Sequence, residues 1–192
     1  GDNAENTGEC LQHTIVKAVY SGYKAIFDSM DAEQGDTVKD FSTTLILSAI
    51  KKVSDGYLLF SFWIGDGGIF VLNSSNEAKL LGVPDSGRYA GQTRFLDGKL
   101  FEGHEIYERI KFEKLSNLKA LILATDGITD AWFETEAMLE NSESWNKLWP
   151  ELEQAVNSFD KSESLQRLTE WMDFWSPGNH DDRTITITLP KE

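Results

Sequence analysis

The sequence predicts an α+β domain in which helices flank antiparallel sheets. Short segments rich in β-branched and aromatic residues lie between glycine-containing turns at 41–73, and amphipathic helical periodicity occurs at 10–30 and 136–175. The predicted order is helix, strands, a glycine-rich stretch, strand, helices and a last strand, which is typical of a layered α+β domain. With 192 residues, 40% of them hydrophobic, the chain is expected to form one domain, residues 1–192, with a buried core.

The first element is a predicted helix from Cys10 to Met30. Its apolar residues recur at steps of three and four and form one stripe, made of Leu11, Ile15, Ala18, Val19, Tyr23, Ile26 and Phe27. The polar residues before Cys10 are interpreted as an irregular start. Residues 31–40 are acidic and polar, and they are predicted to be a connection.

Three strands are predicted next, at 41–50, 57–64 and 69–73. Ser54-Asp55-Gly56 is a turn signal between the first two, and glycines at 65–68 separate the second from the third. The three strands are expected to pair in order as an antiparallel meander.

Residues 74–104 contain Gly82, Pro84, Gly87, Gly91, Gly98 and Gly103, with short apolar pieces between them. They are predicted to be a loop-rich excursion with one small hairpin, of the kind that often borders a site. Residues 106–115 are expected to return to the sheet, and 120–125 form the strongest candidate for a buried strand.

After residue 136 the apolar residues recur at steps of three and four, which predicts two helices with aromatic stripes facing the core. Pro150 either kinks the first of them or begins a new piece at its first helical position. Residues 183–189 alternate apolar and polar side chains and are predicted to be the closing strand.

Charge and cysteine content exclude several classes of function. A formal net charge of −14 argues against binding to nucleic acid or to an anionic membrane surface. It does not exclude phosphate chemistry, because bound divalent cations reverse the local field. The single cysteine, Cys10, rules out an internal disulfide and suggests a reducing compartment. No apolar run approaches the ~20 residues of a membrane span, so a cytoplasmic protein is expected.

Three places put aspartate beside glycine or another aspartate at a predicted strand boundary: IGDGG (64–68), ATDGITD (124–130) and GNHDDRT (178–184). Each has a purely structural reading: a tight hairpin turn at 65–68, a helix N-cap at Thr125 or Asp126, and a solvated loop at 180–182. Together they also suit a hard cation such as Mg²⁺ or Mn²⁺. Such ions take a few carboxylates and keep several waters.

The ordered segments DFSTTL (40–45), FWIGDGGIFVL (62–72), LILATDGITDAW (121–132) and DDRTITITL (181–189) resemble motifs of the type 2C metal-dependent protein phosphatases. The resemblance covers most of the chain from about residue 40. It implies a four-layer α-β-β-α sandwich of antiparallel sheets flanked by helices, with a flap at about 74–104.

The resemblance also implies roles for individual residues. Asp126 and Asp181 match the ligands of the catalytic metal, and Asp66 matches an acid associated with an additional, weaker metal position. Asp182 stands where the family commonly has Asn. The implied cofactors are two Mg²⁺ or Mn²⁺ ions, with a third position. An activated water then hydrolyses phosphoserine or phosphothreonine without a covalent enzyme intermediate.

The family's first motif, an Asp-Gly that bridges both metals, has no counterpart before Cys10. The chain is therefore expected to be an N-terminally truncated form of a longer signalling enzyme, whose intact form acts on phosphorylated proteins and is paired with a Ser/Thr kinase. The truncated chain itself is expected to bind the metal ions only weakly, because the bridging acid is missing, and its own activity is left open. Two alternatives stay open: a catalytically inactive binding or regulatory module, and a hydrolase of small phosphate esters. His180, beside Asp181, is either a proton donor to the leaving oxygen or a solvated neighbour.

Overall fold

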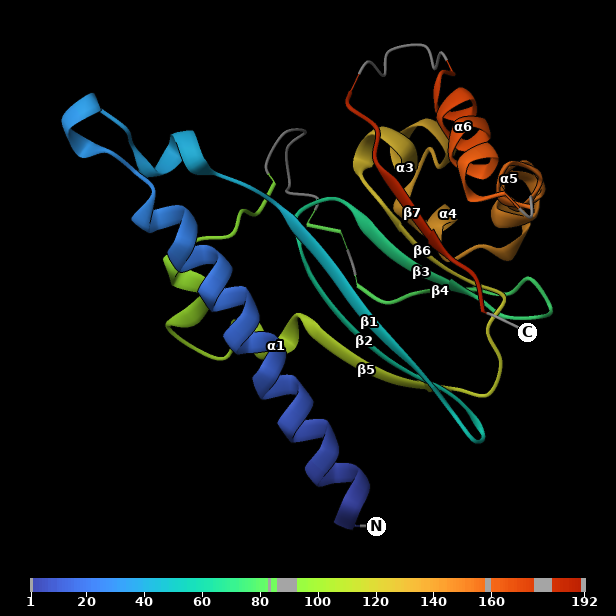
Figure 1. Cartoon of the computed structure of the whole chain (residues 1–192), viewed down its shortest axis with the longest axis horizontal. Helices are drawn as coiled ribbons and strands as arrows, with labels where there is room; N and C mark the ends of the chain where they lie inside the picture. The colour runs from blue at the N-terminus through green and yellow to red at the C-terminus, as the bar shows by residue number, and fades with distance from the viewer. Residues whose placement is uncertain (1, 83, 86–92, 158–159, 175–180, 191–192) are drawn as a thin grey trace. The chain divides into compact units, whose positions relative to one another are not determined.

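A computed structural model describes residues 2–82, 84–85, 93–157, 160–174 and 181–190 (Figure 1). The chain divides into two compact units, Gly1–Asp66 with Pro84–Leu115, and Gly67–Val83 with Ser116–Glu192. Each unit contains an antiparallel sheet and helices. The predicted α+β class, with antiparallel sheets flanked by helices, is confirmed.

The first unit holds a three-stranded sheet of order β1-β2-β5. Its elements are α1 (Asp2–Asp28), η1 (Ala32–Gln34), η2 (Val38–Phe41), β1 (Leu45–Val53), β2 (Gly56–Ile64), η3 (Gly98–Phe101), α2 (Glu105–Glu108) and β5 (Ile110–Leu115). The turn predicted at residues 54–56 is confirmed, because Val53 pairs with Gly56 across a two-residue connection.

The core of this unit lies between α1 and one face of β2. Phe60, Phe62 and Ile64 alternate along the strand and therefore share a face. They cluster with Val19 of α1, and the predicted helix stripe supplies further contacts through residues such as Ile15. The stripe is confirmed, but the helix begins at Asp2 rather than Cys10. Backbone hydrogen bonds can extend a helix over residues that carry no apolar stripe, so periodicity alone placed its start too late.

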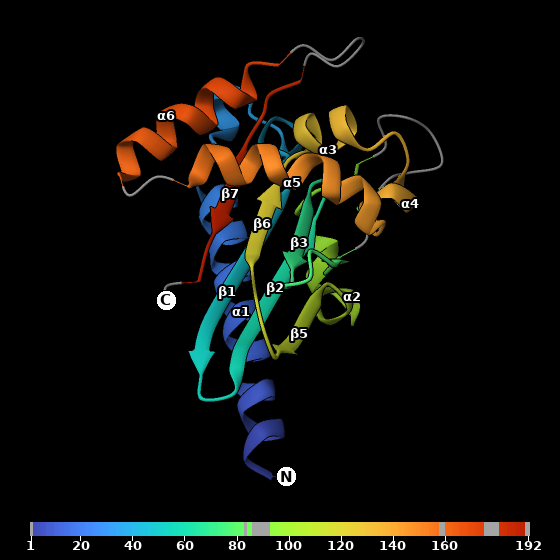
Figure 2. The same cartoon turned by 90° about the vertical axis from the view of Figure 1, so that its right-hand side faces the viewer.

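The second unit holds a four-stranded sheet of order β4-β3-β6-β7. Its elements are β3 (Gly68–Leu72), β4 (Ala78–Leu80), β6 (Ala120–Ala124), α3 (Asp126–Trp132), α4 (Glu136–Leu139), α5 (Ser142–Val156), α6 (Lys161–Met172) and β7 (Ile185–Thr188). Figure 2 shows α5 and α6 lying side by side within this unit, as Figure 1 does. The strand predicted at 120–125 is β6, an interior strand of the sheet. Its side chains are buried or half-buried on both faces, which explains the aliphatic composition of Ala120–Ala124.

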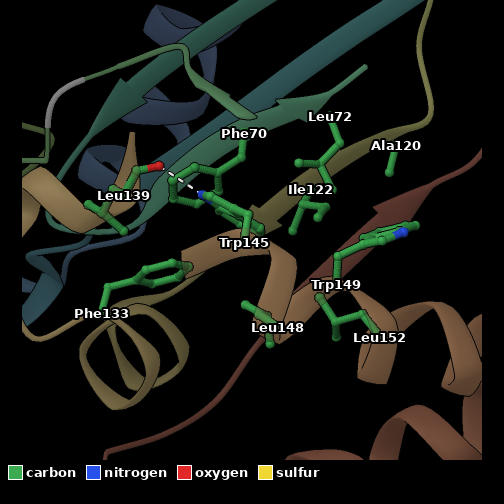
Figure 3. Packing of buried hydrophobic residues seen from close by; sticks show 10 residues of the cluster. All are labelled: Phe70, Leu72, Ala120, Ile122, Phe133, Leu139, Trp145, Leu148, Trp149 and Leu152. Atoms are coloured by element: carbon green, nitrogen blue, oxygen red, sulfur yellow. Dashed lines mark hydrogen bonds between the residues drawn. The ribbon is translucent and has the colours of Figure 1, made fainter. Parts of the chain in front are cut away.

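The core of the second unit packs α5 against the sheet (Figure 3). Trp145 is 2% exposed, and its ring centroid lies 4.8 Å from that of Phe70 and 5.0 Å from that of Phe133. The Trp145 indole N–H donates to the Leu139 carbonyl at 2.8 Å, so the buried polar atom is satisfied. The inward aromatic stripe predicted for the first C-terminal helix is confirmed. That helix is continuous through Pro150, so Pro150 does not begin a new helix.

The predicted meander of three strands is wrong. β2 pairs with β1 and β5, whereas β3 pairs with β4 and β6 in the other sheet. Gly65–Gly68 is therefore a passage between sheets and not a hairpin turn. Gly65 has φ +113°, a conformation that favours glycine, and a side chain there would collide with Thr44. The glycines were read correctly as a break, but a break does not reveal which strands pair.

Smaller differences concern the boundaries of elements. The strand predicted at 41–50 is β1 at Leu45–Val53, because Phe41 ends a 3₁₀ turn. The segment predicted to return to the sheet at 106–115 begins with the short helix α2 before β5. The hairpin expected within 74–104 is not formed by the described residues of that stretch: of its two strands only β4 lies there, and β4 pairs with β3 outside it. No helix in the described ranges has the length and apolar character that crossing a bilayer requires.

Candidate functional site

The end of β6 delivers Asp126 at the start of α3. Thr125 is the N-cap residue, with extended backbone angles, but its hydroxyl does not cap the helix. The Asp126 carboxylate accepts a hydrogen bond from the Gly127 amide at 2.8 Å. A buried strand therefore passes directly into a helical turn whose first residue is a half-buried acid.

The chain before β7 lies against this turn within the same unit. The Thr125 amide donates to the Thr184 carbonyl, and the Thr184 amide donates back to the Thr125 hydroxyl, both at 3.0 Å. The Thr125 hydroxyl also lies 3.4 Å from the Asp182 carbonyl oxygen. We call these two segments, Thr125–Gly127 and Asp181–Thr184, the β6–β7 corner.

Gly127 lets the two segments of the β6–β7 corner approach closely. A Cβ atom at this position would lie 3.0 Å from the Asp182 carbonyl carbon, and closer still to its oxygen. Real Cβ atoms do not make such contacts, so the residue after Asp126 has to be glycine for this packing. The backbone beside Asp126 is consequently not covered by a side chain of its own.

Arg183 anchors the same corner to the end of α6. Its guanidinium donates to the Met172 carbonyl at 3.0 Å and lies 4.2 Å from the centroid of the Phe174 ring. The cation therefore contacts the C-terminal end of α6. No local pattern indicates this role, since a single arginine before a strand has many possible partners.

The third predicted acid, Asp66, belongs to the first unit. It follows Gly65 at the end of β2, and its carboxylate accepts a short hydrogen bond from the Thr93 hydroxyl. The Gly65 amide donates to Asp85 Oδ2 at 2.8 Å, and the Asp85 amide donates to the Gly65 carbonyl at 2.9 Å. Asp66 is thus held by residues that lie far from it in the sequence.

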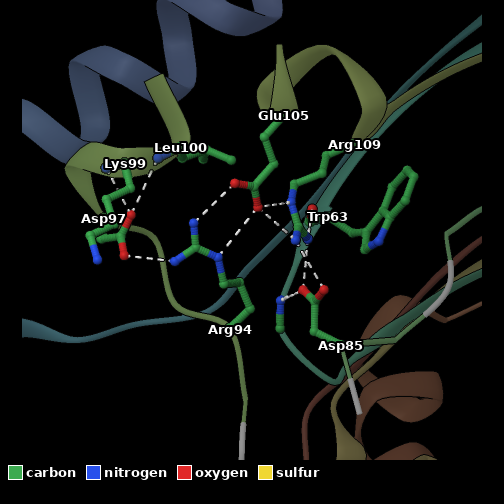
Figure 4. Close-up of polar contacts among 9 residues, drawn as sticks. Trp63, Asp85, Arg94, Asp97, Lys99, Leu100, Glu105 and Arg109 are labelled. Carbon is green, nitrogen blue, oxygen red and sulfur yellow. Dashed lines mark hydrogen bonds and ion pairs between the residues drawn. The ribbon is translucent and has the colours of Figure 1, made fainter. Parts of the chain in front are cut away.

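An ion cluster surrounds Asp85 in this unit (Figure 4). Arg109 donates to both carboxylate oxygens of Asp85, at 2.7 and 3.0 Å, and also to Glu105 Oε1 at 3.0 Å. Arg94 donates to the other Glu105 oxygen at 3.0 Å and to Asp97 at 2.8 Å. Sequence reasoning missed this cluster, because its members are spaced irregularly and match no motif.

The cluster shifts the pKa values of Arg94, Glu105 and Arg109. The hydrogen bond from Arg94 lowers the pKa of Glu105; burial opposes this, and Arg109 lowers it further, so the pKa lies below its ordinary value of 4.5. Burial lowers the pKa of Arg109, but the hydrogen bonds and charges of Asp85 and Glu105 raise it by more. Glu105 and Arg109 are therefore both charged near neutral pH.

The structure brings together the chain segments that carry Asp126 and Asp181, while Asp66 lies in the other unit. Meeting of all three acids at one metal site stays a prediction. His180 lies outside the described residues, and His13 and His104 are exposed. Within the described ranges, no group of three His, Cys, Asp or Glu side chains is arranged to hold a metal ion. Two carboxylates still fit a hard cation that keeps most of its waters.

The fold is an α+β domain with antiparallel sheets flanked by helices, and acids follow the ends of β2 and β6. A sequence model of the family described as Protein phosphatase 2C matches residues 2–173, and the chain belongs to that family. The match includes Asp66 and Asp126 and ends before Asp181.

Several solved structures are similar to the chain. Serine/threonine phosphatase Stp1 from Staphylococcus aureus is similar at 13% identity and a TM-score of 0.50, over 98% of this chain and 69% of that one. The phosphatase domain of SpoIIE from Bacillus subtilis is similar at 17% identity and a TM-score of 0.44, over 91% of this chain and 76% of that domain.

A bacterial serine phosphatase is similar at 14% identity and a TM-score of 0.46, over 78% of this chain. The chain spans only 54% of that phosphatase. No curated protein sequence matches the chain significantly.

Proposed function

We propose that this chain is the core of a metal-dependent protein serine/threonine phosphatase. The observation that carries the proposal is the β6–β7 corner, where hydrogen bonds between Thr125 and Thr184 hold the backbone of Asp126 beside the segment of Asp181. Membership of the Protein phosphatase 2C family supports phosphate-ester hydrolysis as the chemistry at this pair of acids. The proposed substrates are phosphoserine and phosphothreonine in proteins, with a Ser/Thr kinase as cognate partner and the cytoplasm as location.

Asp126 and Asp181 would hold Mg²⁺ or Mn²⁺, and Asp66 would associate with an additional ion. A bound divalent ion supplies Lewis-acid stabilisation of the charge that develops on phosphoryl oxygens. The chain's own contribution is orientation. The paired hydrogen bonds of Thr125 and Thr184 fix the backbone before Asp126 and after Asp181, and Gly127 lets the Asp182 backbone pack against the turn that carries Asp126. His180 remains a proposed proton donor to the leaving oxygen.

One observation favours the rival function, a catalytically inactive binding module. Among the described residues there is no cluster of three metal-ligating side chains, and a phosphatase that uses two metal ions needs several carboxylates around them. The two functions differ in a measurable way, because a binding module would neither take up Mn²⁺ nor hydrolyse a phosphopeptide.

The test is hydrolysis of a phosphothreonine peptide by the full chain with added Mn²⁺, comparing the unaltered protein with Asp126→Asn. We expect Asp126→Asn to lower turnover by about a hundredfold or more, since an oxygen ligand of the ion is lost. Asp130→Asn is the matched control, since Asp130 is exposed on the same short helix, and it should keep most of the activity.

Three results would contradict the proposal. Equal activity of Asp126→Asn and the unaltered chain would remove Asp126 from the chemistry. If the unaltered chain neither binds Mn²⁺ nor hydrolyses the phosphopeptide at saturating Mn²⁺, the binding module is favoured. Activity on sugar phosphates or nucleotides without activity on the phosphopeptide would favour the small-ester hydrolase.

A further inference from the structure

The passage from β2 to β3 is fixed by a residue outside the predicted motifs. Asp85 makes two backbone contacts with Gly65, one through its carboxylate and one through its amide. Gly65 has φ +113° and directly precedes Asp66. Since the backbone at Gly65 sets the direction in which the next residue points, Asp85 acts on Asp66 through a single residue.

Asp85 is itself held in place by Arg109. The two side chains form a two-pronged ion pair, and they are only 20% and 12% exposed. Asp85 Oδ2 accepts from both the Gly65 amide and Arg109 Nη1, so the same oxygen joins the glycine to the arginine. Paired charges in partly buried positions have strong geometric preferences, because a displaced carboxylate loses hydrogen bonds that water does not fully replace.

Arg109 in turn is fixed from the opposite side. Glu105 accepts from Arg109 through Oε1 and from Arg94 through both of its oxygens, and Arg94 also pairs with Asp97. The residue next to Arg94 is Thr93, whose hydroxyl donates to the Asp66 carboxylate. The ion cluster therefore contacts the Asp66 segment at two points, through Asp85 at the preceding glycine and through Thr93 at the carboxylate.

We propose that Asp85 is a positioning residue that directs the Asp66 carboxylate by fixing the backbone of Gly65, with Arg109 holding Asp85 in place. The inference rests on the proposed function, in which Asp66 associates with a divalent ion. It goes beyond that function by tying the metal-binding acid to a cluster of charged residues that no motif contains.

The first measurement requires neither a bound metal ion nor enzyme activity. Hydrogen exchange of the Gly65 amide is followed by NMR in the full chain and in Asp85→Ala. We expect exchange to accelerate about tenfold, the scale that loss of one hydrogen bond gives. Asp85→Asn should be intermediate, because an amide oxygen still accepts from Gly65 but no longer pairs as an anion with Arg109. Asp55→Ala is the matched control, since Asp55 forms an exposed ion pair with Lys114 in the same unit.

The second measurement is Mn²⁺ affinity by calorimetry, in the unaltered background and in Asp66→Asn. Asp85→Ala should weaken Mn²⁺ binding severalfold when Asp66 is present and leave the affinity unchanged when Asp66 is replaced. Asp55→Ala should have no effect in either background. Asp85→Asn keeps the shape of the side chain, so the same two measurements are made on this variant if Asp85→Ala fails to fold.

The outcomes separate the two proposals. Unchanged exchange of Gly65 in both Asp85 variants would overturn the inference, as would a loss of Mn²⁺ affinity that is equally large without Asp66, which is the mark of a general structural effect. If the unaltered chain neither binds Mn²⁺ nor hydrolyses the phosphopeptide, the proposed function fails. The positioning of the Asp66 backbone is then decided by the Gly65 exchange alone.

Discussion

Gly127→Ala should destabilise the protein, although alanine is the better helix former. The new methyl group would lie 3.0 Å from the Asp182 carbonyl carbon, closer to its oxygen, and 3.3 Å from Arg183 Cγ. The nearest obstacle is backbone, which cannot rotate away as a flexible side chain does. The segment Asp181–Thr184 must therefore move away from Thr125, with which it shares two hydrogen bonds of 3.0 Å.

Two terms of opposite sign decide the magnitude. Overpacking of this kind costs roughly 1–3 kcal/mol. Replacing glycine by alanine in a helix gains at most about 1 kcal/mol. The free energy of unfolding is therefore expected to fall by about 1–2 kcal/mol, which lowers the melting temperature by roughly 2–8 °C in a chain of this length.

The assay is thermal unfolding followed by circular dichroism, with Gly22→Ala as the matched control. Gly22 lies inside α1, and a Cβ there meets nothing within 4 Å. The same substitution should stabilise at that position by about 0.5–1 kcal/mol. If Gly127→Ala is as stable as Gly22→Ala, the close approach of the two segments at the β6–β7 corner is refuted.

Two further predictions concern the cores and the charges. Trp145→Ala should lower the free energy of unfolding by about 3–5 kcal/mol, because a 2% exposed ring with a satisfied indole N–H is removed. Leu165→Ala, at a 65% exposed position, should change the free energy of unfolding by no more than about 0.5 kcal/mol. Equal denaturant midpoints for the two variants would contradict the packing of Trp145. Glu105→Gln should destabilise at neutral pH. Since the folded pKa of Glu105 is depressed, its stabilisation is present above the ordinary pKa of 4.5 and is lost as pH falls through the folded value. The difference in unfolding free energy from the unaltered chain should therefore shrink below about pH 4.5, and a difference independent of pH would refute the charge argument.

Local patterns predicted the secondary structure where they were strong. The aliphatic run at 120–125 became β6, the stripe at Trp145, Leu148 and Leu152 became the inward face of α5, and the turn signal at 54–56 became the β1–β2 turn. Each of these depends on residues a few positions apart. The start of α1 and the division of 106–115 into α2 and β5 were misplaced, because hydrogen bonding within the backbone extends or interrupts elements without changing the apolar pattern.

The candidate site was predictable in part. The acids at strand ends could be named from the sequence, since glycine beside aspartate at the end of an apolar run is a local signal. Asp85, Arg94, Glu105 and Arg109 could not be named, because charged residues in a strongly acidic chain are common and only their meeting in space distinguishes them.

The sequence by itself determined most of the strands and the longer helices, apart from their boundaries, and which acids stand at the ends of strands. Tertiary structure alone decided that β3 leaves the sheet of β2 and joins β6, that Thr125 bonds to Thr184, and that Asp85 holds Gly65. The physical reason is the range of the forces involved. Periodicity and turn preference act within a few residues, whereas the edge of any strand offers the same backbone donors and acceptors to every other strand. The choice among those partners is made by side-chain packing and ion pairing between residues that are distant in the chain.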